Sequence, residues 1–260
     1  MIRLTAATAV AVVCLLAGTA VAVADEYVAL GDSYSSGTGT REYFDSGCER
    51  SAYAYPELVA DQVPGLELSF AACSGAETSD VLSGQVSSLS ASTDWVTITI
   101  GGNDAGFVDV ITECALPGWL SDCPGALDDA EEFIEGTLPG RLDDVYEEVG
   151  DDAPNATAAV LSYPRLFNGE DCNAGTFFSS SELKRLNEVA DLLRDVTEER
   201  VEAAGAGFEF VDAIPSFVGH AVCDSPEWLN GLSWPVGESF HPNKSGHSSG
   251  YAPLVLEVIE

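Results

Sequence analysis

The chain has 260 residues, 46% of them hydrophobic, and its 43 acidic side chains against 10 Lys and Arg give a formal net charge of −33. This length predicts one large domain with an ample core, and the hydrophobic fraction excludes a globally disordered chain. The charge excludes nonspecific binding to nucleic acid, whose phosphates need Lys and Arg, and disfavours docking on anionic lipid.

The beginning of the chain has the pattern of a secretory signal peptide. Arg3 provides a positive charge, residues 5–20 form an apolar segment, and an Ala-Val-Ala sequence then fits the small-residue cleavage rule. A membrane anchor is the alternative, but the apolar segment is short and lacks a basic flank. We therefore expect residues 1–24 to be removed and residues 25–260 to form a single secreted domain.

Short apolar runs alternate with helical patterns along the rest of the chain. The runs that predict buried strands are residues 26–30, 66–71, 95–100, 157–162 and 207–211. Helical periodicity covers residues 52–62, 105–113, 126–149 and 181–204, with Ser180 or Ser181 as N-cap and Gly205 as the stop, and a last helix is expected at 245–259. Such alternation predicts a three-layer α/β/α sandwich around a five-stranded, mostly parallel sheet, with ligands bound beyond the carboxyl ends of the strands.

Cysteines are the next constraint. Cys14 leaves with the signal peptide, and the six that remain in an oxidising compartment allow 15 pairings. Pairing of nearest neighbours predicts the bridges Cys48–Cys73, Cys114–Cys123 and Cys172–Cys223. A zinc site is the alternative, but the chain has no CxxC and its three histidines are scattered.

Candidate site residues follow the first three predicted strands. Ser33 lies in the turn after the first strand, Gly75 after the second, and Asn103 after the third, while His241 lies in a loop before the last helix. The carboxyl ends of parallel strands share one edge of a sheet, so these residues are expected to converge on one crevice.

Ser33 is the candidate nucleophile. A hydroxyl at a strand-to-helix turn is exposed, and a neighbouring base can take its proton. The alternative is that Ser33 only caps the following helix.

The base should be a histidine, because neutral imidazole accepts a proton near neutral pH. His241 lies in a Gly-, Ser- and Pro-rich loop that can present its ring, whereas His220 and His247 are expected to be structural. The N–H groups of Ser33 and Gly75 and the amide of Asn103 could stabilise an oxyanion. Alternatively, Gly75 is a plain turn glycine and Asn103 bonds its own backbone.

In order along the chain, Gly31-Asp32-Ser33, Gly75, Gly101-x-Asn103-Asp104 and His241-Pro242-Asn243 resemble the four blocks of the GDSL or SGNH hydrolase family. The resemblance spans the chain from Asp25 to the last helix. The six cysteines, the Trp-Leu-Asn-Gly sequence at 228–231 and the final HPNxxGH resemble the secreted actinomycete branch of esterases, lipases and phospholipases. The resemblance implies Ser33 and His241 as catalytic residues and Ser33, Gly75 and Asn103 as the oxyanion hole.

One position departs from the family pattern. The family usually has Asp three residues before the histidine, and here that residue is Glu238. Members of this branch resemble dyad enzymes in which a backbone carbonyl near that position orients the imidazole. Either the Glu238 side chain or the carbonyl of Glu238 or Ser239 is therefore expected to hold His241, with the carbonyl favoured. Asp32 and Asp104 are expected to stabilise turns.

The predicted function is that of a secreted, monomeric serine hydrolase of lipid esters, either acylglycerols or phospholipid acyl groups. It is expected to use no cofactor and no metal, and to have no nucleic-acid partner and no stable membrane anchor. One alternative is an acetyl esterase acting on polysaccharides. Another is a non-catalytic carbohydrate- or lipid-binding module, in which the Ser, Gly, Asn and His set would be idle.

Overall fold

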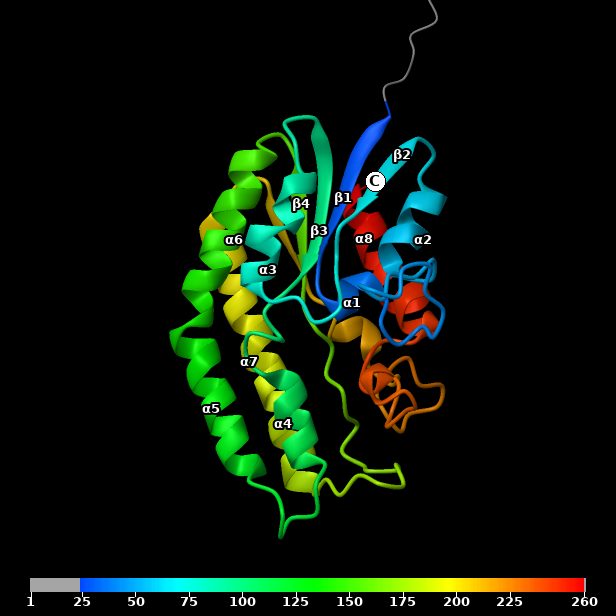
Figure 1. The fold of residues 1–260 in the computed structure, drawn as a ribbon, viewed down its shortest axis with the longest axis vertical. Coiled ribbons are helices and arrows are strands. Elements are labelled where there is room, and N and C mark those ends of the chain that lie inside the picture. The colour runs from blue at the N-terminus through cyan, green and yellow to red at the C-terminus, as the bar shows by residue number, and fades with distance from the viewer. Residues whose placement is uncertain (1–23, 260) are drawn as a thin grey trace, which may run out of the picture.

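The computed structural model describes residues 24–259 (Figure 1). The signal peptide predicted for residues 1–24 lies, except for its last residue, outside this range. Within the range, no helix combines the length and the apolar character that crossing a bilayer would require.

The sheet is parallel throughout, with the strand order β2-β1-β3-β4-β5. Its strands are β1 (Asp25–Gly31), β2 (Leu66–Phe70), β3 (Thr93–Thr99), β4 (Thr157–Leu161) and β5 (Phe208–Val211). The central strands β1 and β4 are buried over runs of four or five residues, whereas the edge strands β2 and β5 mix buried with more exposed positions. Continuous burial is what parallel strands covered on both faces require. The predicted five strands are therefore confirmed, with ends displaced by one or two residues.

Helices cover both faces of the sheet (Figure 1). On one face α2 packs against α8, and on the other α6 packs against both α3 and α7. The helices are α1 (Ser33–Ser36), α2 (Tyr55–Gln62), α3 (Thr78–Ser83), α4 (Phe107–Cys114), α5 (Cys123–Gly136), α6 (Leu138–Asp152), α7 (Ser180–Ala204) and α8 (Ala252–Ile259). The predicted three-layer α/β/α sandwich is thus the observed architecture.

The structure differs from the sequence prediction at several helix boundaries. The helix expected at 126–149 is two helices, α5 and α6, because Pro139 at the start of α6 has no N–H to continue the helical ladder. The cap of α7 is Ser179 rather than Ser180 or Ser181: its hydroxyl accepts the Glu182 N–H at 3.3 Å, and the Glu182 carboxylate accepts the Ser179 N–H at 2.6 Å.

Several short elements were not predicted from the sequence. Helices α1 and α3 are too short to show a periodic pattern. The last predicted helix begins as a π-helical turn over Gly246–Tyr251 before α8. Three 3₁₀ turns complete the list: Gln85–Ser88, Pro215–Phe217 and Val236–Glu238.

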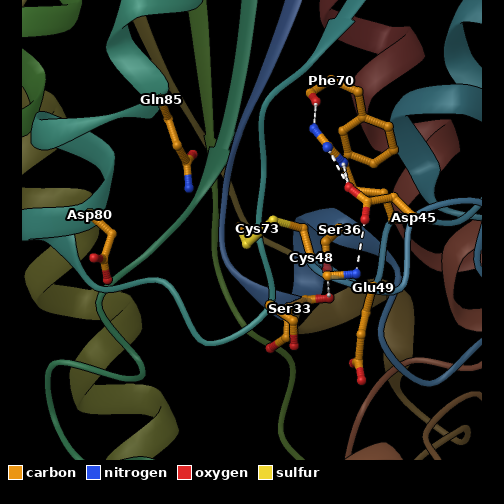
Figure 2. Close-up of a disulfide and its surroundings, with 12 residues drawn as sticks. Ser33, Ser36, Asp45, Cys48, Glu49, Phe70, Cys73, Asp80 and Gln85 are labelled. Atoms are coloured by element: carbon orange, nitrogen blue, oxygen red, sulfur yellow. Dashed lines mark hydrogen bonds and ion pairs between the residues drawn. A yellow bond between two sulfur atoms is a disulfide. The ribbon is translucent and has the colours of Figure 1, made fainter.

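Three disulfides join Cys48 to Cys73, Cys114 to Cys123, and Cys172 to Cys223, which are the predicted pairs. The first ties the loop after α1 to the turn after β2, close to Ser33 (Figure 2). The second closes the loop between α4 and α5. The third links the segment after β4 to the long loop after β5. Each bridge therefore constrains a loop that has little regular secondary structure.

We predict that removing a bridge destabilises the fold more when the loop that the bridge closes is longer, with the logarithm of the loop length. The bridges Cys172–Cys223 and Cys114–Cys123 span 51 and 9 residues. The double variant Cys172→Ser/Cys223→Ser should lose about 2–4 kcal/mol of unfolding free energy, and Cys114→Ser/Cys123→Ser about 1.5 kcal/mol less than that. Urea denaturation measures both losses. A larger loss for the short bridge would contradict this account.

Candidate active site

Four loops meet at the carboxyl edge of the sheet and line one cavity of about 420 Å³. Ser33, Gly75, Asn103 and His241 all line it, as the sequence predicts. The three turns after β1, β2 and β3 bring the first three residues together, and the loop before the π-helical turn brings His241.

The turn before Ser33 is shaped by close contact between β1 and β3. Gly31 has a φ of +118°, and a Cβ there would lie 2.4 Å from the Thr99 carbonyl oxygen, so only glycine fits. The Asp32 N–H donates to that same oxygen at 3.0 Å. The Asp32 carboxylate accepts the Tyr34 N–H at 2.9 Å and so caps α1. Ser33 is consequently held as the first residue of a buried helix.

Ser33 and His241 are hydrogen-bonded. The distance from Ser33 Oγ to His241 Nε2 is 2.8 Å, and that from His241 Nδ1 to the Ser239 carbonyl oxygen is 2.9 Å. A carbonyl oxygen only accepts, so the ring proton lies on Nδ1 and Nε2 is free to accept the serine proton. Burial lowers the pKa of His241 to about 4, although the Ser239 carbonyl opposes the shift, and the ring is therefore neutral.

Of the alternatives at Glu238 and Ser239, the structure has the carbonyl of Ser239. The buried Glu238 carboxylate accepts the Tyr43 hydroxyl at 2.7 Å, and the Glu238 carbonyl accepts the Asn230 amide at 3.2 Å. Between Ser239 and His241, Phe240 adopts a φ of +60°, the left-handed conformation that non-glycine residues rarely adopt. This turn places the Ser239 carbonyl against the imidazole.

The backbone of Asn230 holds the histidine loop in place. Its N–H donates to the His241 carbonyl at 2.9 Å, and its carbonyl accepts the Phe240 N–H at 2.9 Å. Its side-chain amide also donates to the Gly39 carbonyl at 2.9 Å. The Trp-Leu-Asn-Gly sequence noted above thus contributes a clamp on the loop that carries His241.

The candidate oxyanion donors surround the same end of the cavity. Among residues 24–259, neither the Ser33 N–H nor the Gly75 N–H has a hydrogen-bond acceptor. One hydrogen of the Asn103 amide is donated to the Ala76 carbonyl at 2.9 Å, which orients the amide and leaves its second hydrogen available. Gly75 has a φ of +82°, so a side chain there would be strained.

A tyrosine that sequence reasoning missed joins two of the turns. Tyr163 follows β4, donates its hydroxyl proton to Asp32, and accepts the Gly102 N–H at 3.1 Å. Burial raises the pKa of Asp32 to about 7, opposed by the hydrogen bonds that the carboxylate accepts. The position of Tyr163 at the carboxyl end of the fourth strand was the available signal. Asp32 is thus a structural residue of the turn, as expected.

Asp104 holds the neighbouring turn to α3 and α6. Its carboxylate accepts the N–H of Thr78 at 2.9 Å and pairs with Arg141 at 2.8 Å. The carboxylate is thereby fully occupied away from Ser33, which fits the predicted role as a turn residue.

The other two histidines lie outside the cavity. His220 stacks on Trp228 with ring centroids 3.6 Å apart. His247 is fully buried and accepts the Tyr55 N–H at 3.3 Å, and burial lowers its pKa to about 3. Both contacts are those of structural side chains.

The walls of the cavity are largely apolar, which the sequence did not reveal. One wall is the inner face of α4, with Phe107 and Ile111, and another comes from α7 and the loop before His241. Further apolar lining residues are Val108, Ala115, Leu116, Pro164, Leu166, Ala190, Leu193, Leu232, Val236 and Phe240. The Ser33 hydroxyl therefore opens onto a space that suits a hydrocarbon chain.

Known proteins are similar to this chain over most of its length. The model of the GDSL-like Lipase/Acylhydrolase family matches residues 29–248. Lipase 1 of Streptomyces coelicolor is 45% identical over 240 residues, covering 90% of this chain and 87% of that protein. Crystal structures of an extracellular lipase from Streptomyces rimosus (TM-score 0.84, 42% identity) and of phospholipase A1 from Streptomyces albidoflavus (TM-score 0.83, 43% identity) are similar over 90% of this chain and 99% of theirs.

We predict an unusually acidic limit for activity. Burial lowers the pKa of His241 to about 4, so kcat/KM for a soluble ester should be half-maximal near pH 4 rather than near 6.5. The pKa of Asp32 is raised to about 7, and the profile is therefore repeated with Asp32→Asn. If kcat/KM falls to half near pH 4 in both enzymes, the titrating group is His241. A half-maximal value near pH 6.5 in both enzymes would contradict the lowered pKa of His241.

The control for this profile is the folded fraction. The folded pKa of His241 lies below that of the unfolded chain, so the unfolded chain binds more protons between about pH 6.5 and 4. This contribution to stability is present above about pH 6.5 and is lost as the pH falls through that window. Circular dichroism at each pH separates loss of fold from protonation of the base.

A second prediction concerns Glu238. Its carboxylate bonds Tyr43 and not His241, so Glu238→Gln should lower kcat by no more than about tenfold, or roughly 1.4 kcal/mol. Tyr43→Phe, which removes the hydroxyl that donates to this carboxylate, is the matched control and should likewise lower kcat by no more than about tenfold. A thousandfold loss in Glu238→Gln, with unchanged melting, would instead make the carboxylate a third catalytic member.

Proposed function

The chain belongs to the GDSL-like Lipase/Acylhydrolase family, and we propose that it is a secreted serine hydrolase of lipid esters, either acylglycerols or phospholipid acyl groups. The observation that carries the proposal is the hydrogen bond from Ser33 to a neutral, partly buried His241 at the wall of an apolar cavity. The similarity to Streptomyces enzymes named lipase and phospholipase A1 supports this substrate class.

The reaction has two halves. Ser33 Oγ attacks the ester carbonyl carbon while its proton passes to His241 Nε2, and the resulting oxyanion accepts hydrogen bonds from the Ser33 and Gly75 N–H groups and the Asn103 amide. The protonated imidazole gives this proton to the leaving alcohol as the ester bond breaks. A water molecule then attacks the acyl-enzyme, His241 takes and returns its proton, and the fatty acid and free Ser33 are released.

The Ser239 carbonyl takes the part that a carboxylate plays in a triad. It holds the proton on Nδ1 while His241 is neutral, and its oxygen dipole stabilises the imidazolium that forms during acyl transfer. Ser33 and His241 therefore work as a dyad in this proposal.

The cavity favours a long acyl chain over an acetyl group. Its apolar lining and volume of about 420 Å³ exceed what an acetyl group would fill. A polysaccharide deacetylase would need mainly polar side chains at the mouth to bind sugars, whereas most of the exposed lining side chains here are apolar, namely Val108, Leu116, Leu232 and Val236. Secretion is supported by six paired cysteines, which are typical of oxidising compartments.

The proposal predicts labelling and a substrate preference that can be measured together. The parent should react with a fluorophosphonate probe at Ser33 and hydrolyse p-nitrophenyl esters of long acids, but not acetylated xylan. Ser33→Ala should lose both labelling and nearly all turnover, whereas His220→Ala, altered at a histidine outside the cavity, should keep most of both. Release of acetate from xylan at a higher kcat/KM than from long-chain esters would favour the deacetylase, and near-parental turnover by Ser33→Ala would reject the mechanism.

A further inference from the structure

Exposed apolar side chains surround the mouth of the cavity. Val108 and Leu116, in and just after α4, line the cavity and are also exposed to solvent. Leu232 and Val236, on the loop before His241, do the same on the other side. The inner walls therefore continue outward onto the surface without a polar border at these positions.

Two tryptophans extend this apolar surface. Trp119 is 82% exposed on the loop after α4, and Trp234 is 85% exposed on the loop between Leu232 and Val236. Tryptophan is usually well buried, and apolar side chains gathered on a surface mark an interaction site. We call the following set the apolar rim: Val108, Leu116, Trp119, Leu120, Phe177, Leu232, Trp234 and Val236.

The two sides of the apolar rim belong to segments far apart in the chain. Helix α4 and the loop over residues 220–240 both extend beyond the carboxyl edge of the sheet, on opposite sides (Figure 1). Phe177 joins the first side, since its N–H donates to the Ala115 carbonyl at 3.1 Å. The rim thus brackets the opening toward Ser33.

Hydrogen bonds and a disulfide hold both sides in this exposed arrangement. The Cys114–Cys123 bridge closes the loop that carries Trp119, and the Leu120 N–H donates to the Pro117 carbonyl at 2.7 Å. On the other side the Ser233 N–H donates to the Ser239 hydroxyl at 2.9 Å. The exposure of the tryptophans is consequently built into the fold.

Charge decides which partner fits this surface. Residues 107–122, 170–183 and 229–240, which carry the rim, contain seven acidic residues and no Lys or Arg, and the whole chain has a net charge of −33. Arg41 lies beside the rim and donates to the Ser233 hydroxyl at 3.2 Å, but it is one positive charge against these seven negative ones. The net charge therefore opposes docking on an anionic surface, and two copies of the chain repel each other. An uncharged or zwitterionic lipid surface offers apolar contact without that repulsion.

We propose that the apolar rim docks the enzyme on the surface of neutral or zwitterionic lipid aggregates, with Trp119 and Trp234 as anchors on either side of the cavity mouth. The proposal rests on the proposed function, because the occupant of the cavity is then a chain drawn from that aggregate. Docking sets the mouth against the lipid, so that an acyl chain passes from one apolar phase to another.

The test measures binding apart from turnover. In a Ser33→Ala background, Trp119→Ala and Trp234→Ala are each expected to weaken partitioning onto phosphatidylcholine vesicles several-fold, and the double variant more than about tenfold. Phe44→Ala removes an aromatic side chain that is 60% exposed and does not line the cavity, and this control should partition like its parent. Co-sedimentation with sucrose-loaded vesicles gives the partition coefficient.

Salt and lipid charge supply a second readout. Binding to phosphatidylcholine should change little between ~0.05 and ~0.5 M salt, because it is apolar. Binding to phosphatidylglycerol vesicles should be weaker at low salt and approach the phosphatidylcholine value as salt screens the repulsion. Tighter binding to the anionic vesicles, or equal binding by the double variant and its parent, would overturn the proposal.

Activity on a soluble ester separates this proposal from the proposed function. With Ser33 intact, the double variant should hydrolyse a short-chain p-nitrophenyl ester like the parent while losing rate on vesicles. A parent enzyme that hydrolyses no ester would reject the proposed function, and vesicle partitioning would still test docking by itself. A parent that sediments as a dimer, which the tryptophan substitutions dissociate, would assign the rim to a second copy of the chain and overturn lipid docking.

Discussion

The hydrogen bond from His241 Nδ1 to the Ser239 carbonyl fixes which nitrogen of the ring can accept the Ser33 proton, and much of the surrounding structure serves to hold it. Phe240 is kept in a left-handed conformation between the two partners, and its carbonyl accepts the Tyr34 hydroxyl at 2.7 Å. Such backbone strain persists only where the surroundings impose it. Because the carbonyl is a dipole rather than a charge, it offsets little of the effect of burial, and the imidazole stays neutral far below its usual pKa.

Buried polar groups elsewhere in the site tie loops together instead of taking part in acyl transfer. Asp32 caps α1 and accepts from Tyr163, whose hydroxyl also holds the Gly102 N–H. A carboxyl group that is fully buried is unfavourable unless its oxygens are paired, and these bonds pair them. The turns that carry Ser33 and Asn103 are thereby coupled, so that the nucleophile and the candidate oxyanion donor keep a fixed relation.

The sequence was sufficient for the strands, the parallel layers and the convergence of four site residues, because alternation of strands and helices places turns at one edge of the sheet. It could not decide whether Glu238 or Ser239 orients His241. That outcome depends on the φ of Phe240 and on the hydrogen bonds by which Asn230 positions the loop. Tyr163 was missed because its partner Asp32 lies 131 positions away in the chain. The cavity and the apolar rim depend likewise on packing between remote segments, which no local pattern records.

The acidity of the chain and its apolar rim have complementary effects on association. Exposed tryptophans beside an open apolar cavity would ordinarily promote self-association. A net charge of −33 opposes contact between two copies, whereas it acts only weakly against a surface without charge of its own. The side chains of the rim are all apolar, so their own contact with lipid does not require any of them to lose the hydration of a charge. Repulsion between molecules and attraction to uncharged lipid can therefore coexist on one chain, because the first acts through the whole surface and the second only through the rim.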